Sequence, residues 1–113
     1  LMAFQRVTPT RLAQAASTTA FLAIYTCPPN TRAYVKDITV CNTTGDAVTL
    51  FVSLVPDEGT AGTANALFSA SSIAANTTFQ WKGTQILSES ETIQFKGSAT
   101  GLTIHVSGGE AIE

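Results

Sequence analysis

The sequence predicts an all-β protein, a single-domain antiparallel β-sandwich or jelly roll with an N-terminal arm. Three observations lead to this fold class. Short segments of alternating apolar and polar residues recur about every ten residues, as they do in sandwiches and jelly rolls. Clusters of Gly, Pro, Asn and Ser stand between these segments and are typical of turns. The length of 113 residues suits one domain with a single modest core.

Residues 1–17 differ in character from the rest of the chain. They begin with apolar residues, Pro9 interrupts them, and residues 11–16 suit either a helical turn or an extended segment. Chain termini are poorly ordered unless they dock on something. We therefore predict an arm over residues 1–17 that reaches a neighbouring subunit, followed by a β-sandwich domain over residues 18–113.

Residues 18–76 are expected to form strands separated by turns, with strands within residues 21–27, 32–41 and 47–55. In the last of these, apolar positions recur with the period of a strand that buries one face. The first set, on the face expected to be buried, consists of Val48, Leu50, Val52 and Leu54. The second set, on the opposite face, consists of Thr49, Phe51, Ser53 and Val55. Because Phe51 and Val55 belong to the second set, either both faces of the strand are covered or one of them is an interface.

The strand predicted over residues 32–41 has the same period. Tyr34, Ile38 and Val40 are separated by even numbers of residues and are expected to share one face, with Lys36 interrupting it. A long polar loop, residues 56–65, follows the next strand and is of the kind that crosses between sheets or carries contacts. Short edge segments are expected at residues 66–69 and 72–74.

The last third of the chain repeats the strand pattern three times. Turns are expected at residues 88–91 and 97–101. The predicted inward faces consist of Phe79 and Trp81, then Ile93 and Phe95, then Leu102, Ile104 and Val106. For Trp81 we expect core packing, with an interface role or sugar stacking as the alternatives.

The composition restricts the class of partner. Charged residues make up 12% of the chain, against about 25% in a typical domain, which suggests that part of the surface is covered by other copies or by a partner. The net charge of −2 and the scattered basic residues exclude a nucleic-acid footprint. We expect neither a secretory signal nor a segment that crosses a membrane.

The residues offer little for chemistry. His105 is the only histidine and lies on the polar face of a predicted strand, with no Gly-x-Ser-x-Gly elbow in the chain. The neighbouring carboxylates Asp57 and Glu58, like Glu89 and Glu91, lie in predicted turns and are expected to be solvated. We therefore expect no enzymatic activity, no metal and no cofactor.

The two cysteines fall in adjacent predicted strands. A disulfide between Cys27 and Cys41 is geometrically possible, but two free thiols are favoured in the absence of a secretory signal.

The order of several motifs resembles a family of small structural proteins of tailed bacteriophages. Its pattern is a strand ending in Tyr-Thr-x-Pro, a strand ending in Cys-Asn-Thr, and an apolar strand closing in Leu-Val-Pro before a Gly-rich loop. These motifs stand here at residues 25–28, 41–43 and 54–56. Further matching segments are residues 6–9, 65–67, 73–78, 87–93 and 107–110, so that the resemblance covers nearly the whole chain.

The resemblance implies a virion protein, assembled in the host bacterial cytoplasm, with no catalytic residues. The first expectation is a capsid decoration (cement) protein that binds the major capsid protein as a homotrimer. The alternatives are a component of the tail, baseplate or fibre, or a carbohydrate-binding host-recognition module, which requires an exposed Trp81 or Tyr34. The expected interface residues, taken from the arm, the outward face of residues 47–55 and the loop, are Phe4, Arg6, Phe51, Val55, Asp57 and Glu58.

Overall fold

The computed structural model describes residues 6–112 and contains eight β-strands and one 3-10 turn. These elements are β1 (Arg6–Ala16), β2 (Leu22–Thr26), β3 (Thr31–Asn42), β4 (Val48–Val55), η1 (Thr63–Asn65), β5 (Ala66–Ile73), β6 (Thr78–Leu87), β7 (Thr92–Gly97) and β8 (Leu102–Ile112). In this part of the chain no helix has the length and apolar character needed to cross a membrane.

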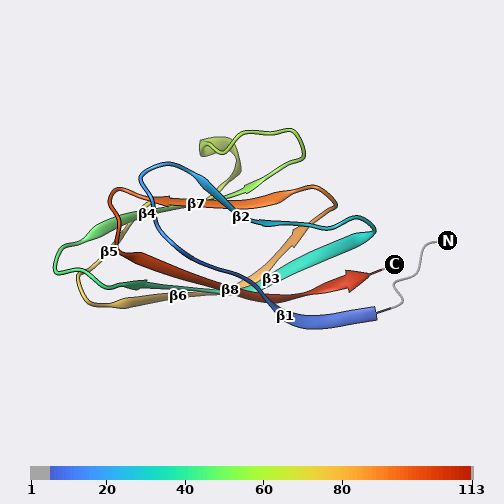
Figure 1. Cartoon of the computed structure of the whole chain (residues 1–113), viewed down its shortest axis with the longest axis horizontal. Helices are drawn as coiled ribbons and strands as arrows, with labels where there is room; N and C mark the ends of the chain where they lie inside the picture. The colour runs from blue at the N-terminus through green and yellow to red at the C-terminus, as the bar shows by residue number, and fades with distance from the viewer. Residues whose placement is uncertain (1–5, 113) are drawn as a thin grey trace.

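The strands form two antiparallel sheets that pack face to face, as Figure 1 shows. Their strand orders are β1-β8-β3-β6 and β2-β7-β4-β5. Strands β4 and β5 pair as neighbours along the chain, and β3 then pairs with β6, β2 with β7 and β1 with β8. This successive pairing from the middle of the chain outward is a jelly roll, one of the two architectures that the sequence predicts.

The core lies between the two sheets and consists of the inward residues of alternating positions. The predicted inward sets of β4, β7 and β8 are confirmed, with Leu54 half-buried at the margin of the core. Phe79 and Trp81 also face inward from the edge strand β6 and are half-buried. Phe68 of β5 contacts both rings edge-to-face, with centroids 5.5 Å from Phe79 and 6.3 Å from Trp81. This aromatic cluster closes the side of the sandwich where the edge strands β5 and β6 meet.

Strand β3 departs from the simple period of two. Its register with both β6 and β8 shifts between Val35 and Asp37, which marks a β-bulge at Lys36. As a result Ala33 and Val35 are buried on the same side as Ile38 and Val40. The prediction that Tyr34 shares a face with Ile38 and Val40 is therefore wrong, because the extra residue reverses the alternation.

For residues 6–16 the structure differs from the expected arm. They form β1, which is hydrogen-bonded to β8 along its length, and Leu12 and Ala13 are buried in the core. A register shift between Arg11 and Ala13 lets these two consecutive residues be buried together. Pairing with β8 and burial of this apolar pair hold the segment in the sheet.

The turns lie where the sequence predicts them. Chain segments 43–47, 56–65, 88–91 and 98–101 connect strands. The two expected edge segments after the long loop form one strand, β5, in which Ala70 has a positive φ of 58°. Cys27 and Cys41 are both free, and Cys41 pairs with Thr78 and Thr103 across the sheet, so the two cysteines are not cross-strand neighbours.

Candidate interaction surfaces

The predicted interface residues Phe51 and Val55 lie on the outer face of the β2-β7-β4-β5 sheet. Their cross-strand partners are Lys96 and Thr92, whereas inward positions of β4 face Phe95 and Ile93. Val55 is only 1% exposed and does not belong to the main core. The long loop, residues 56–65, covers it, and Figure 1 shows this loop and η1 projecting beyond this sheet. Val55 is therefore already buried within its own chain.

The covering loop is held by its own hydrogen bonds. Gly59 N–H donates to the carbonyl of Pro56 at 2.9 Å, and Glu58 adopts a positive φ of 62° in this turn. Asn65 accepts from Gly62 N–H at 3.1 Å and donates to the carbonyl of Thr60 at 2.9 Å. The predicted residues Asp57 and Glu58 are exposed at the loop surface. The loop is thus a fixed rim that presents two carboxylates.

The remaining predicted interface residues lie elsewhere. Arg6 is the first residue of β1 and pairs with Ile112, in the opposite sheet from Phe51. Phe4 lies outside the described residues. The structure therefore brings together the residues predicted from β4 and from the loop, and it does not bring Arg6 to them.

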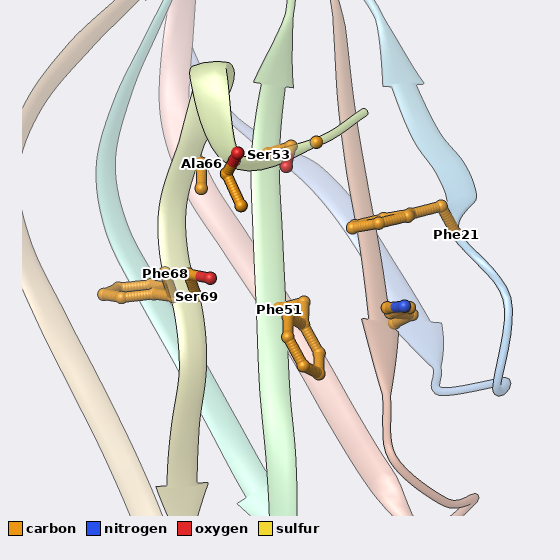
Figure 2. A pocket seen from close by; sticks show the side chains of 9 residues that line it. Phe21, Phe51, Ser53, Ala66, Phe68 and Ser69 are labelled. Carbon is orange, nitrogen blue, oxygen red and sulfur yellow. The ribbon is translucent and has the colours of Figure 1, made fainter. Parts of the chain in front are cut away.

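Beside the loop, the outer face of the β2-β7-β4-β5 sheet contains a hollow of about 160 Å³. The ammonium of Lys96 lies 4.9 Å from the centre of the Phe21 ring and 4.8 Å from that of the Phe51 ring. This geometry is a double cation–π contact. Figure 2 shows Phe21 and Phe51 on either side of the opening. The lining residues are Phe21, Phe51, Ser53, Gly62, Thr63, Ala66, Phe68, Ser69 and Lys96.

The outer face of the other sheet carries a row of apolar residues across all four strands. Pro9 of β1 pairs with Gly109 of β8, Gly109 with Tyr34 of β3, and Tyr34 with Ile86 of β6. Val7 and Ala111 extend the row by one further pair. Val7 is 59% exposed and Ile86 is 56% exposed. We name this surface the apolar band; its members are Val7, Pro9, Tyr34, Ile86, Gly109 and Ala111.

The apolar band is bordered by a charged row in the same register. Arg11 pairs with Ser107, Ser107 with Asp37, and Asp37 with Lys82. The carboxylate of Asp37 accepts hydrogen bonds from Thr39 at 2.8 Å and from Gln80 at 2.8 Å. An apolar strip beside polar residues has the anatomy of a protein interface, in which a dry centre is surrounded by a polar rim.

A third group lies between the sheets at one end of the sandwich. The hydroxyl of Tyr25 donates to the carboxylate of Glu110 at 2.5 Å and links β2 to β8. Burial, together with the hydrogen bond to Glu110, raises the pKa of Tyr25. Burial also raises the pKa of the Cys27 thiol, which donates to the carbonyls of Thr31 and Leu87. A protonated, buried thiol is a poor nucleophile, so Cys27 is not suited to chemistry. The hydrogen bond between Tyr25 and Glu110 is a structural link between the sheets.

The two residues on which the sugar-binding alternative depends are both half-buried. Trp81 packs in the aromatic cluster with Phe68 and Phe79. The ring of Tyr34 lies over Gly109, where a β-carbon would overlap its hydroxyl. His105 lies on the outer face of β8, between Gln14 and Thr39. Among the described residues no group of three His, Cys, Asp or Glu side chains is placed to hold a metal ion.

Sequence reasoning missed both the apolar band and the role of Lys96. Ile86 is apolar and lies at an even spacing from the polar residues Gln80 and Lys82, which is a weak signal for an outward apolar position. The band needs the pairing of β1, β8, β3 and β6, which links residues far apart in the chain. In the sequence Lys96 only alternates with the inward residues Ile93 and Phe95, and its contact with Phe21 depends on a loop conformation that the sequence pattern does not encode.

Comparison with known proteins identifies the fold but no family. No family of known proteins matches the sequence, and no curated protein sequence matches it either. A chain in a structure of infectious bursal disease virus, Gx strain, matches with a TM-score of 0.57 and 13% identity, over 95% of this chain and 32% of that chain. This protein therefore spans about a third of the viral chain.

Two further solved structures match with a TM-score of 0.45 each. One is a chain of the Gt strain of the same virus, at 7% identity over 96% of this chain and 32% of that chain. The other comes from the disulfide-linked pili of Bacillus endospore appendages, at 14% identity over 99% of this chain and 95% of that chain. At 13% identity, the similarity to the Gx strain chain shows a shared fold alone.

Proposed function

We propose that this protein is a bacteriophage virion structural protein, a decoration protein that binds the outside of the capsid shell as a homotrimer and stabilises it. The observation that carries the proposal is the apolar band, which crosses the whole outer face of one sheet. Contiguous exposed apolar surface rimmed by polar residues marks sites of protein association.

The band is the surface by which we propose that copies associate. Two of its exposed members, Val7 and Ile86, lie on the opposite edge strands β1 and β6, so contact along the band would engage the full width of the sheet. This face is formed by hydrogen-bonded strands and needs little ordering when it binds, which lowers the entropic cost of association. The low proportion of charged residues, 12%, is consistent with a surface of which a part is covered.

Fold and resemblance support the same proposal. Jelly rolls of eight strands are frequent in viral capsid domains, and one chain in a structure of infectious bursal disease virus shares the fold over 95% of this chain. The motif order in residues 25–56 resembles small structural proteins of tailed bacteriophages. The outer face of the β2-β7-β4-β5 sheet, with its hydrogen-bonded loop, is then free to contact the shell.

The location of the protein on purified particles tests the proposal. Virions labelled with antibody against this protein and imaged by electron microscopy should carry label over the whole head. Shells that lack the protein should become more resistant to heat when it is added back. Label confined to the tail or its tip would exclude a decoration role and favour a tail component. Absence of the protein from purified virions would exclude a virion function altogether.

A further inference from the structure

We propose that the hollow beside the long loop is a binding site for a carboxylate side chain, a glutamate or aspartate, of the protein on which this one docks. This inference rests on the proposed function, because it names the chemistry of the partner in the shell. The β2-β7-β4-β5 sheet would then contact the shell protein through this hollow, whereas the apolar band lies on the other sheet.

The position of Lys96 is the first step of the argument. Its ammonium lies between the rings of Phe21 and Phe51, at 4.9 and 4.8 Å from their centres. Lys96 and Phe51 are also cross-strand partners on the paired strands β7 and β4. The rings attract the cation and restrict the long side chain, so little rotamer entropy remains to be lost when a ligand binds.

The charge of the hollow is the second step. Of the described residues that line it, Lys96 is the only charged one and none is acidic. Ring faces attract a cation but do not supply the hydrogen-bond acceptors that an ammonium group needs for its three donors. An anionic oxygen is the group that complements this arrangement best, because a charge-assisted hydrogen bond is roughly twice as strong as a neutral one.

The remaining lining residues indicate how the rest of the ligand is held. Ala66 supplies apolar wall, and Ser53, Thr63 and Ser69 bring hydroxyl-bearing side chains. A volume of about 160 Å³ is similar to that of cavities of about 150 Å³ that hold one benzene molecule, and is therefore enough for one side chain. A short methylene stem ending in a carboxylate has both the size and the polarity of this site.

A charge-reversal experiment on particles tests the inference. Lys96→Glu should lower the affinity of the protein for shells by about tenfold or more, since like charges then meet at the contact. The matched control is Thr78→Glu, which introduces a carboxylate on the outer face of the opposite sheet, at the end of β6 away from the apolar band, and should leave affinity within about twofold. Circular dichroism of both variants checks that they are folded. Equal affinity of the two folded variants would overturn the inference while leaving the proposed function intact.

A titration of the isolated protein separates the site from the proposed function. Capped tripeptides Ala-Glu-Ala and Ala-Gln-Ala would be added at about 10 mM, because a single contact of this kind binds in the millimolar range. The Glu peptide should shift the NMR signals of Lys96, Phe21 and Phe51, and the Gln peptide should not. Equal shifts with both peptides, or none with either, would overturn the inference. Stronger shifts with glucuronate than with the Glu peptide would also overturn it, in favour of an acidic sugar.

The two experiments fail in different ways. If the wild-type protein does not bind shells at all, the proposed function fails, and the peptide titration alone decides whether the hollow accepts a carboxylate. If the wild-type protein binds shells and the peptides leave Lys96 unchanged, the proposed function stands and the carboxylate site is excluded.

Discussion

At the scale of single residues, buried polar groups fix the ends of strands. Asn42 is fully buried at the end of β3. Its amide donates to the carbonyls of Asp46 and Ile73 at 2.8 and 3.0 Å, and its oxygen accepts from the backbone and hydroxyl of Thr44 at 2.9 and 2.7 Å. One side chain thus connects the β3–β4 turn to the end of β5, because every polar atom of a buried amide needs a partner.

The first prediction concerns this network. Asn42→Ala removes all four of these hydrogen bonds, although the carbonyl of Asp46 keeps one from the hydroxyl of Thr44, and should lower the free energy of unfolding by about 3 kcal/mol. Urea denaturation followed by circular dichroism measures the loss. Gln14→Ala, on the exposed outer face of β1, is the control and should change stability by less than about 0.5 kcal/mol. Equal midpoints for the two variants would contradict the role given to Asn42.

The second prediction concerns the link between the sheets. The pKa of Tyr25 is raised by burial and then by Glu110, above its unfolded value of about 10. The raised pKa of Tyr25 therefore contributes fully to the free energy of unfolding below about pH 10. This contribution is lost as the pH rises toward the pKa of Tyr25 in the folded protein. The unfolding free energy of the wild type should fall more between about pH 9 and about pH 11 than that of Tyr25→Phe.

The control for this pH effect is Tyr34→Phe, which leaves the bond between Tyr25 and Glu110 in place. Its unfolding free energy should fall with pH as the wild type does. If Tyr25→Phe shows the same slope as Tyr34→Phe, the hydrogen bond between the sheets does not contribute to the pH dependence.

At the scale of elements, the central pair of strands β3 and β8 sets the geometry of the outer face. The bulge at Lys36 turns Tyr34 outward and keeps Ala33 and Val35 in the core. Strand β8 accommodates the bulge with Gly108, which pairs with Val35. A β-carbon at Gly108 would overlap the backbone carbonyl oxygen of Tyr34, so only glycine permits this close approach of the two strands.

The third prediction follows from that contact. Gly108→Ala must displace backbone rather than a flexible side chain, and should lower the free energy of unfolding by about 3 kcal/mol. Gly45→Ala is the matched control, because a β-carbon there meets no atom within 4 Å, and it should be neutral within about 0.5 kcal/mol. Chemical denaturation compares the two variants. A stable Gly108→Ala protein would show that the strands can separate without cost.

At the scale of the whole molecule, the two sheets have different outer faces. The β2-β7-β4-β5 sheet is partly covered by its own loop, which buries Val55 and leaves the hollow around Lys96. The β1-β8-β3-β6 sheet has no such loop in the described chain and exposes the apolar band. This asymmetry is the reason for assigning association between copies to one face and docking to the other.

The fourth prediction addresses that assignment. The wild-type protein should sediment as a trimer at micromolar concentration, and Ile86→Glu should weaken the trimer by about tenfold or more because it places a charge in the apolar band. Thr78→Glu, an exposed position on the outer face of the same strand, should leave the assembly unchanged. Analytical ultracentrifugation of the three proteins measures this. A monomeric wild type would overturn self-association.

The sequence by itself determined the fold class, the turns and most of the inward residues of β4, β7 and β8. These properties depend on the period of two and on turn residues, which act over a few neighbouring positions. The tertiary structure alone decided the rest. It reversed the face of Tyr34 through a one-residue bulge, drew residues 6–16 into the sheet through β8, and covered Val55 with a loop. The apolar band brings together residues of β1, β8, β3 and β6, and the cation between two rings brings together residues of β4, β7 and a loop. No local period encodes which strands become neighbours.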